Sequence, residues 1–392
     1  MSARPSQSDT AAALGLEWSP GTPVSLRGAG LMMGCWALCS ALLLLFRPGY
    51  LFPPFELLDS WIYTSYQWAP RAQIADFGVT YYGSRLSWIL PGALLHHYLP
   101  PVAAELVFKL GASAVLAGAV GLIVHAGHGP RWGAVGVIAT VCCPAVIQAF
   151  HADYIDTPVF TYATLTAAFI TWSRDARWWP LWIGAAGGSL MLMLVANLGA
   201  LSSVGLALGV YHLAWLRWSV RRHALSLACY AAGAGVVFLA IGAMHAHLGG
   251  PFYFIKPQVD MVLFFKNVKS NPWAPTDPHW FLSAHWLILP FASLAWGAYC
   301  SFFLETKDAR TRTLLRSLTA ALTTSLGVAL YVEMRRTASV LSLYYYTSFH
   351  LAFALPLLAV CAAGSFRPPL RPWHLGALLA GSLLIVLCLP PL

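Results

Sequence analysis

Long apolar segments recur along the whole chain of 392 residues. A helix needs about 20 mostly apolar residues to cross a bilayer, and only helices and closed barrels satisfy all their backbone polar groups there. Hydrophobic residues make up 58% of the chain and charged residues only 9%, whereas a soluble domain has about 25% charged residues. The sequence therefore predicts an all-α, polytopic integral membrane protein.

Eleven segments are long and apolar enough to be predicted as transmembrane helices. They lie at 28–46, 102–124, 132–150, 158–172, 180–196, 198–216, 224–247, 285–304, 317–332, 340–363 and 375–392. Residues 1–27 are rich in Ser, Pro and Ala, so we expect a disordered cytoplasmic tail there, followed by one transmembrane domain over 28–392. The first span is too long for a signal-peptide core and no clear cleavage site follows it, which predicts a retained anchor.

The distribution of positive charge predicts the orientation of the spans. With a cytoplasmic N-terminus, 14 of the 23 Lys and Arg residues fall in inside segments and 8 in outside segments, while Lys109 lies within a span. This bias agrees with the positive-inside rule. Two outside segments, 47–101 and 248–284, are long enough to carry function or structure of their own. Apolar residues at helical spacing predict an interfacial amphipathic helix over 56–69.

Several classes of protein are excluded by the same pattern. All eight cysteines lie in apolar stretches, so no loop carries a disulfide framework or a thiolate zinc site. The net charge is +9, but the basic residues are scattered between spans, so we expect no nucleic-acid partner. No acid is predicted at a mid-span position, unlike in ion-coupled transporters.

One carboxylate, Asp59, lies among apolar residues just beyond the first span. Such a carboxylate can be held partly desolvated and act as a general base, although an ordinary interfacial acid fits the same spacing. Farther along, Tyr82 and Arg85 lie in the stretch 81–92. The Arg85 guanidinium offers a fork of donors suited to phosphate, and the alternative is a topology residue beside an aromatic belt.

A second acidic motif lies in the turn between the third and fourth predicted spans. His151 and Asp153 carry nitrogen and oxygen donors that suit a divalent cation, but two donors are too few to define a metal site. We expect Asp153 to be a second carboxylate in a site shared with Asp59. Asp156 precedes Thr157 and Pro158, a pattern typical of a helix N-cap.

Basic and aromatic residues follow in later outside segments. Arg335 and Arg336 precede a run of tyrosines that includes Tyr345 at the mouth of the tenth span. These residues are suited either to a phosphate facing the outside leaflet or to a plain charged surface with an aromatic belt. The segment 248–284 mixes aromatic side chains with cations, which suits the tail and headgroup of a lipid. Its cations are Lys256, Lys266 and Lys269.

Taken together, these motifs resemble the GT-C superfamily of integral-membrane glycosyltransferases, and in particular bacterial members similar to the protein mannosyltransferase and aminoarabinose transferase group. In this resemblance, Asp59 matches the acid of the first extracytoplasmic loop and Asp153 matches the acidic motif outside the third span. The first motif has a single acid where many members have an adjacent pair. The sequence therefore does not decide whether a divalent cation takes part, and no other cofactor is expected.

The resemblance implies transfer of a sugar from a polyprenyl-phosphate donor to an acceptor on the extracytoplasmic face of a bacterial inner membrane. Asp59 would be the general base of an inverting displacement, with Asp153 in the same cavity. Basic residues, aromatic residues and His151 would bind substrate: Tyr82, Arg85, His151, Lys256, Lys266, Lys269, Arg335, Arg336 and Tyr345. A lipid or polyisoprenoid transporter or flippase is the main alternative, and a non-catalytic membrane scaffold is a third.

Overall fold

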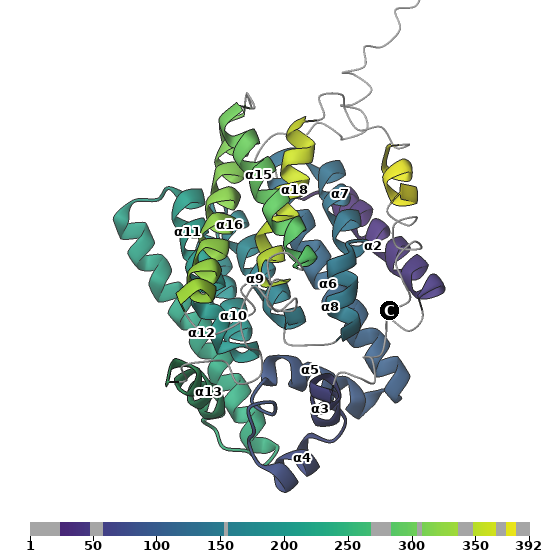
Figure 1. Ribbon diagram of the computed structural model, residues 1–392, viewed down its shortest axis with the longest axis vertical. Helices are drawn as coiled ribbons and strands as arrows, with labels where there is room; N and C mark the ends of the chain where they lie inside the picture. Colours follow the sequence, from purple (N-terminus) through teal and green to yellow (C-terminus); the bar gives the residue numbers. More distant parts are fainter. Residues whose placement is uncertain are drawn as a thin grey trace, which may run out of the picture.

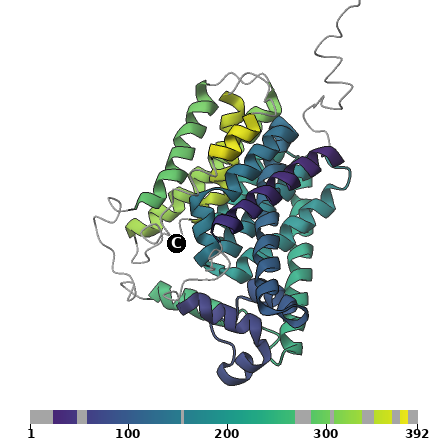
Figure 2. The ribbon, with the colours of Figure 1, turned by 90° about the vertical axis from the view of Figure 1, so that its right-hand side faces the viewer.

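The computed structural model describes residues 24–47, 58–152, 156–267, 284–303, 308–335, 348–365 and 374–381. Within these residues every regular element is a helix, which confirms the all-α prediction for this part of the chain. Long helices pack side by side, and several short ones lie across one end of the bundle (Figures 1 and 2). The short helices at that end are α3 (Leu58–Trp68), α4 (Pro70–Phe77), α5 (Leu86–Tyr98) and α13 (Lys256–Asn267).

Among the residues that the structure describes, seven helical segments are long and apolar enough to cross a membrane. They are α2 (Leu26–Phe46), α6 (Pro101–His128), α10 (Trp179–Ala196), the unit of η2 (Leu198–Leu201) and α11 (Val204–Leu216), α12 (Val220–His247), α16 (Ala309–Arg335), and the unit of η4 (Ser348–His350) and α18 (Leu351–Ser365). α15 (Ile288–Phe303), which follows η3 (His285–Leu287), is apolar but shorter. The chain therefore has the helices of a polytopic membrane protein, and the prediction of eleven spans is not confirmed in number.

The third predicted span is broken rather than continuous. α7 (Pro130–Val141) and α8 (Pro144–Ala152) meet at a bend of 53°. Pro144 explains the break, because proline lacks the backbone N–H that a continuous helix needs and its ring clashes with the preceding turn. The pair counts as an eighth span if its two halves are taken together. The bend aims the end of α8 toward the short helices.

The fourth predicted span is α9 (Asp156–Ser173), a helix that is not among the seven. Its threonines lower its hydropathy, yet they are buried, and three of them return a hydrogen bond to a carbonyl four residues earlier. These bonds run from Thr164 to Phe160, from Thr166 to Tyr162 and from Thr171 to Ala167. Such back-bonding satisfies the hydroxyl within the helix, so a threonine-rich helix can lie at the centre of the bundle.

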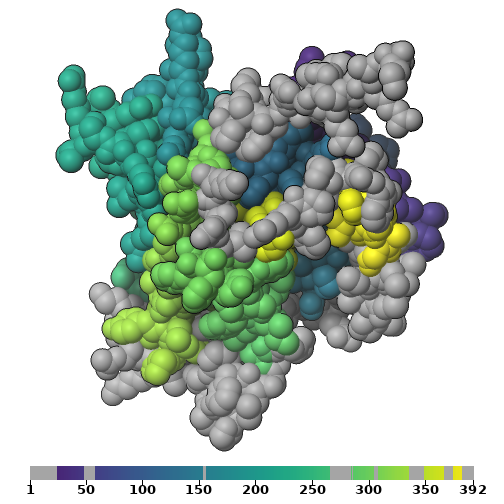
Figure 3. All heavy atoms as spheres, turned by 90° about the horizontal axis from the view of Figure 1, so that it is seen from above, coloured from purple at the N-terminus to yellow at the C-terminus, as the bar shows by residue number. Residues whose placement is uncertain are grey.

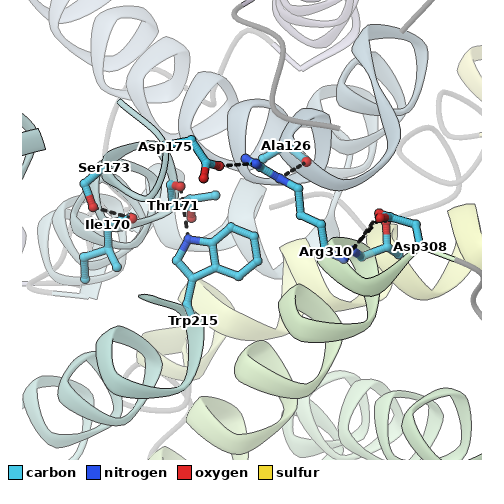
Figure 4. A network of polar contacts seen from close by, with 9 residues as sticks. Ala126, Ile170, Thr171, Ser173, Asp175, Trp215, Asp308 and Arg310 are labelled. Atoms are coloured by element: carbon cyan, nitrogen blue, oxygen red, sulfur yellow. Dashed lines mark hydrogen bonds and ion pairs between the residues drawn. The ribbon is translucent and has the colours of Figure 1, made fainter. Parts of the chain in front are cut away.

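Polar contacts join the helix ends in two groups, one at each end of the bundle. This is expected for a chain that crosses a bilayer several times. At one end the short helices contact the ends of α8 and α10. At the other end Arg310 at the start of α16 contacts Ala126 near the end of α6 and Asp175 after α9 (Figure 4). In Figure 3, which looks onto this second end, the teal segments between α9 and α12 form one edge beside the green α15 and α16.

Cysteine labelling would show which end faces outward. We expect a cysteine at the exposed position Asp76, in α4, to react with an impermeant thiol reagent added to intact cells. A cysteine at the exposed position Arg177, after α9, should react only in permeabilised cells. The unmodified chain is the background control, and reversed labelling of the two positions would overturn the orientation.

α10 and α12 cross in close contact. An added Cβ at Gly233 would lie 1.8 Å from the Gly184 carbonyl oxygen, and one at Gly187 would lie 2.2 Å from the Tyr230 carbonyl oxygen. No side chain larger than glycine fits at this crossing without moving a backbone. Small residues at such positions are a common way for membrane helices to gain van der Waals contact.

Gly233→Ala is therefore expected to lower stability, because the methyl group must push α12 away from α10. Overpacking of this kind costs about 1 to 3 kcal/mol. The matched control is Gly235→Ala on the same helix, where an added Cβ meets no atom within 4 Å. Thermal unfolding of the two variants in detergent compares them, and equal melting temperatures would contradict the tight crossing.

Candidate functional site

Asp59 lies in the first turn of α3, at the end of the bundle covered by the short helices, and it is half-buried. Tyr82 donates a hydrogen bond to its carboxylate. Burial raises the pKa of the Tyr82 hydroxyl, and the negative charge and hydrogen bond of Asp59 raise it further. Tyr82 therefore keeps its proton at neutral pH and orients the carboxylate.

Arg85 is the cation of this group. It is 3% exposed, and its guanidinium carbon lies 4.3 Å from the ring centre of Tyr81 and 5.3 Å from that of Tyr63. Burial raises the pKa of Tyr63 well above its ordinary value, while the charge of Arg85 opposes that change. We refer to Asp59, Tyr63, Tyr81, Tyr82 and Arg85 as the Asp59 cluster.

The local sequence explains why the cluster forms. Asp59 and Tyr63 are four residues apart on α3, so they share one face of the helix. The turn that carries Tyr81 and Tyr82 includes Gly83, where an added Cβ would lie 2.8 Å from the ring of Tyr66. Glycine at this position lets the turn approach α3 closely enough for Tyr82 to reach the carboxylate.

The helix predicted over 56–69 is confirmed as α3 within the described residues, and its two faces are now known. Leu58 and Trp68 are exposed, whereas Tyr63 and Gln67 are buried. The apolar side thus faces away from the protein, where an interface would lie, and the polar side faces the bundle. The hydroxyl and amide groups of α3 therefore face the helix bundle.

Arg85 also stabilises the end of α10, which the sequence does not predict. Its Nη1 donates to the carbonyl of Ala196 at 3.2 Å. A guanidinium at a helix C-terminus satisfies a carbonyl that lacks an intrahelical partner and complements the helix dipole. Arg85 is therefore buried and bound to backbone, and it is neither a snorkelling residue nor an exposed fork of donors.

Gln258 of α13 completes the same junction. Its side-chain nitrogen donates to the carbonyls of Val195 and Ser84 at 2.6 and 3.3 Å, and its oxygen accepts from the N–H of Leu198 at 3.0 Å. The residue is only 2% exposed. One amide thus fixes α13 to the break between α10 and η2 and to the residue before Arg85.

The end of α8 adjoins the Asp59 cluster. Ser60, the neighbour of Asp59, donates to the carbonyl of Ala152, and the ammonium of Lys109 in α6 donates to the carbonyl of Phe150 at 3.2 Å. His151 between them is buried. Asp153 lies outside the described residues, so the shared cavity of Asp59 and Asp153 stays a prediction. The described neighbour of Asp153 is nevertheless in direct contact with the neighbour of Asp59.

Asp156 differs from its predicted role as a simple helix cap. It is the first residue of α9, 2% exposed, and its Oδ2 accepts a hydrogen bond of 2.9 Å from Ser348. It also borders a small cavity between α8, α9 and η4, with about 30 Å³ of space for water-sized molecules. Gln148 and Trp286 are among the other residues that line this cavity. Asp156 therefore joins distant parts of the chain.

The remaining predicted substrate-binding residues are not gathered around Asp59 by the described structure. Lys256 is exposed and forms an ion pair with Asp260 one turn along α13. Lys266 and Arg335 fall in the last turns of α13 and α16, where their side chains are not described. Three other residues of the set lie outside the described ranges: Lys269, Arg336 and Tyr345. Across those ranges no three His, Cys, Asp or Glu side chains are placed to hold a metal ion.

Sequence reasoning missed Tyr63, Lys109, Gln258 and Ser348. Lys109 carried a signal, because a cation inside an apolar span is rare and usually has a partner. The other three are ordinary polar or aromatic residues in their segments, and only the packing of distant helices gives them partners. Comparison with family models, with curated proteins and with solved structures finds no match for this chain.

Proposed function

We propose that the protein is a membrane glycosyltransferase that moves a sugar from a polyprenyl-phosphate donor to an acceptor at the outer face, with Asp59 as the general base. The observation that carries the proposal is the half-buried Asp59 carboxylate, which is oriented by Tyr82, a tyrosine that also lies in the field of buried Arg85. A carboxylate held in this way can accept the proton of an acceptor hydroxyl as that oxygen attacks the anomeric carbon.

The surroundings of Asp59 suit a sugar substrate. The rings of Tyr63 and Tyr82 lie 5.7 Å apart, and those of Tyr81 and Tyr82 lie 5.6 Å apart. Aromatic faces of this kind give a rigid apolar surface with polar edges, against which the C–H face of a sugar ring can pack. The proposed transfer is an in-line displacement, so the anomeric centre of the sugar would be inverted.

Arg85 takes a different part in this proposal from the one its sequence suggests. Its guanidinium is stacked on tyrosines and bound to Ala196, so it supplies a positive field rather than a direct contact with the donor phosphate. Direct contacts would fall to the outside cations whose side chains are not described, such as Lys266 and Arg335. Asp153 would position the acceptor or hold a divalent cation.

A second candidate, a lipid transporter, is favoured by one specific observation. Lys109 and Glu105 are four residues apart on α6, and both are buried. The Oε1 of Glu105 lies 3.1 Å from the Nε2 of His96. Buried ionisable residues in a membrane helix often line an ion or substrate path. A transporter of this kind would need Lys109 and Glu105 and would tolerate loss of the Asp59 carboxylate.

Mass spectrometry of a strain that lacks the protein tests the proposed function. We expect one sugar-bearing glycolipid or envelope polymer to lose that sugar, and its polyprenyl-phosphate donor to accumulate. Expression of the parent chain should restore the product, whereas a variant with Asn at Asp59 should not. A sugar profile identical to that of the parent strain would count against a transferase.

A further inference from the structure

A second polar cluster lies at the opposite end of the bundle from Asp59, around the indole of Trp215. This residue is fully buried, and its N–H donates to the carbonyl of Thr171 at 3.0 Å (Figure 4). The guanidinium carbon of Arg174 lies 4.5 Å from the indole centre, and that of Arg310 lies 5.5 Å from it. Two cations therefore share one aromatic ring.

The acids at this end are already engaged. Arg310 pairs with Asp175 and also donates to the Ala126 carbonyl at 3.0 Å. Asp308 caps α16, because its carboxylate accepts from the backbone N–H groups of Arg310 and Thr311 at 3.1 and 2.8 Å. These hydrogen bonds lower the pKa of Asp308 although burial opposes the change. Among the described residues, no acid is paired with Arg174.

Arg174 is in an unfavourable environment for a cation. Its Nη1 is buried and has no hydrogen-bond partner. Burial lowers the pKa of Arg174, and the charges of Arg310 and Arg217 lower it further, with Asp175 opposing them. Arg217 itself ends α11 in the left-handed conformation, at φ 46°, a position that usually favours glycine. Three guanidiniums thus gather at this end, where the two described carboxylates, Asp175 and Asp308, already have partners.

We propose that Arg174 and Arg217, with Arg310 behind them, form a binding site for a phosphate group at this end of the protein. A phosphate would supply an acceptor oxygen for the Nη1 of Arg174 and further negative charge for the three guanidiniums, and arginine forks match phosphate oxygens in pairs. Trp178 and Leu181, which follow Arg174 closely in the sequence, are exposed apolar residues, so this part of the chain suits the surface of the bilayer. Either an anionic phospholipid headgroup or a soluble phosphate compound can present this group.

Two probes separate the sources of the phosphate. Native mass spectrometry of the purified full chain, incubated with equal amounts of phosphatidylglycerol and phosphatidylcholine, measures preference for the anionic lipid. Calorimetric titration with inorganic phosphate measures binding of the soluble anion. A cation near a charged membrane surface contributes about 1 kcal/mol, or about fivefold in affinity. We therefore expect Arg174→Gln and Arg217→Gln each to weaken binding about fivefold.

Arg177→Gln is the matched control, because this exposed arginine follows the same helix but stacks on Trp178 instead. If the preference for phosphatidylglycerol falls in Arg174→Gln and in Arg217→Gln but not in Arg177→Gln, the site binds a lipid headgroup. If the protein shows no lipid preference, and inorganic phosphate binds more weakly to Arg174→Gln and Arg217→Gln than to Arg177→Gln, the site binds a soluble phosphate compound. Arg217 is exposed, so its variant keeps the test decisive if Arg174→Gln does not fold. Equal binding by the parent and both variants, or an equal loss in the control, would overturn the proposal.

Discussion

Asp59→Asn is expected to lower the rate of sugar transfer about 100-fold to 10,000-fold, the usual contribution of a general base. Asparagine has nearly the same shape as aspartate, and its carbonyl oxygen can still accept the hydrogen bond from Tyr82. The variant should therefore fold and bind donor like the parent while lacking the group that takes the proton. Transfer of a radiolabelled sugar by the purified protein measures the effect.

Asp76→Asn provides the control for this experiment. Asp76 is an exposed acid of α4, in the same layer of short helices, and the Asp59 cluster does not include it. We expect its variant to transfer sugar at the parental rate. If Asp59→Asn were as active as Asp76→Asn, the carboxylate would have no part in the chemistry.

The second large effect is expected from Arg85→Leu, and it should be an effect on stability. The leucine cannot donate to the Ala196 carbonyl, which would be left without that partner, and the stacking with Tyr81 and Tyr63 would be lost. Together these losses amount to about 3 kcal/mol. We expect a lower melting temperature in detergent and exposure of the junction between α10 and α13 to proteolysis.

Arg71→Leu is a suitable comparison for Arg85→Leu. Arg71 is exposed on α4, where it contacts His247 at 3.4 Å, so its loss should change the melting temperature little. If Arg85→Leu instead kept the parental melting temperature and weakened donor binding, Arg85 would be a phosphate ligand, as its sequence context first suggests.

The helices could be predicted from the sequence because apolar length and helix propensity are local properties. The segments predicted at 28–46 and 180–196 correspond closely to α2 and α10. The break before Pro144 also has a local cause, which apolar length alone conceals. Hydropathy alone does not fix the number of spans, because the threonines of α9 lower its hydropathy although they are buried and one of them bonds back within the helix.

The partners of the polar residues could not be predicted, because they depend on how distant helices pack. Gln258 bonds backbone groups 60, 63 and 174 residues earlier, and Arg85 bonds Ala196 across 111 residues. No periodicity in the sequence encodes which helices become neighbours. Asp59 stands out in the sequence as a candidate because an acid among apolar residues is unusual, whereas the tyrosines around it resemble any aromatic belt.

The proposed function is tested most directly by following a synthetic polyprenyl-phosphate sugar in liposomes that contain the purified protein and a hydroxyl acceptor. We expect release of free polyprenyl phosphate together with a glycosylated acceptor whose anomeric configuration is inverted, and loss of both products in Asp59→Asn. Movement of intact donor across the bilayer without release of polyprenyl phosphate would contradict the proposed function and favour a transporter.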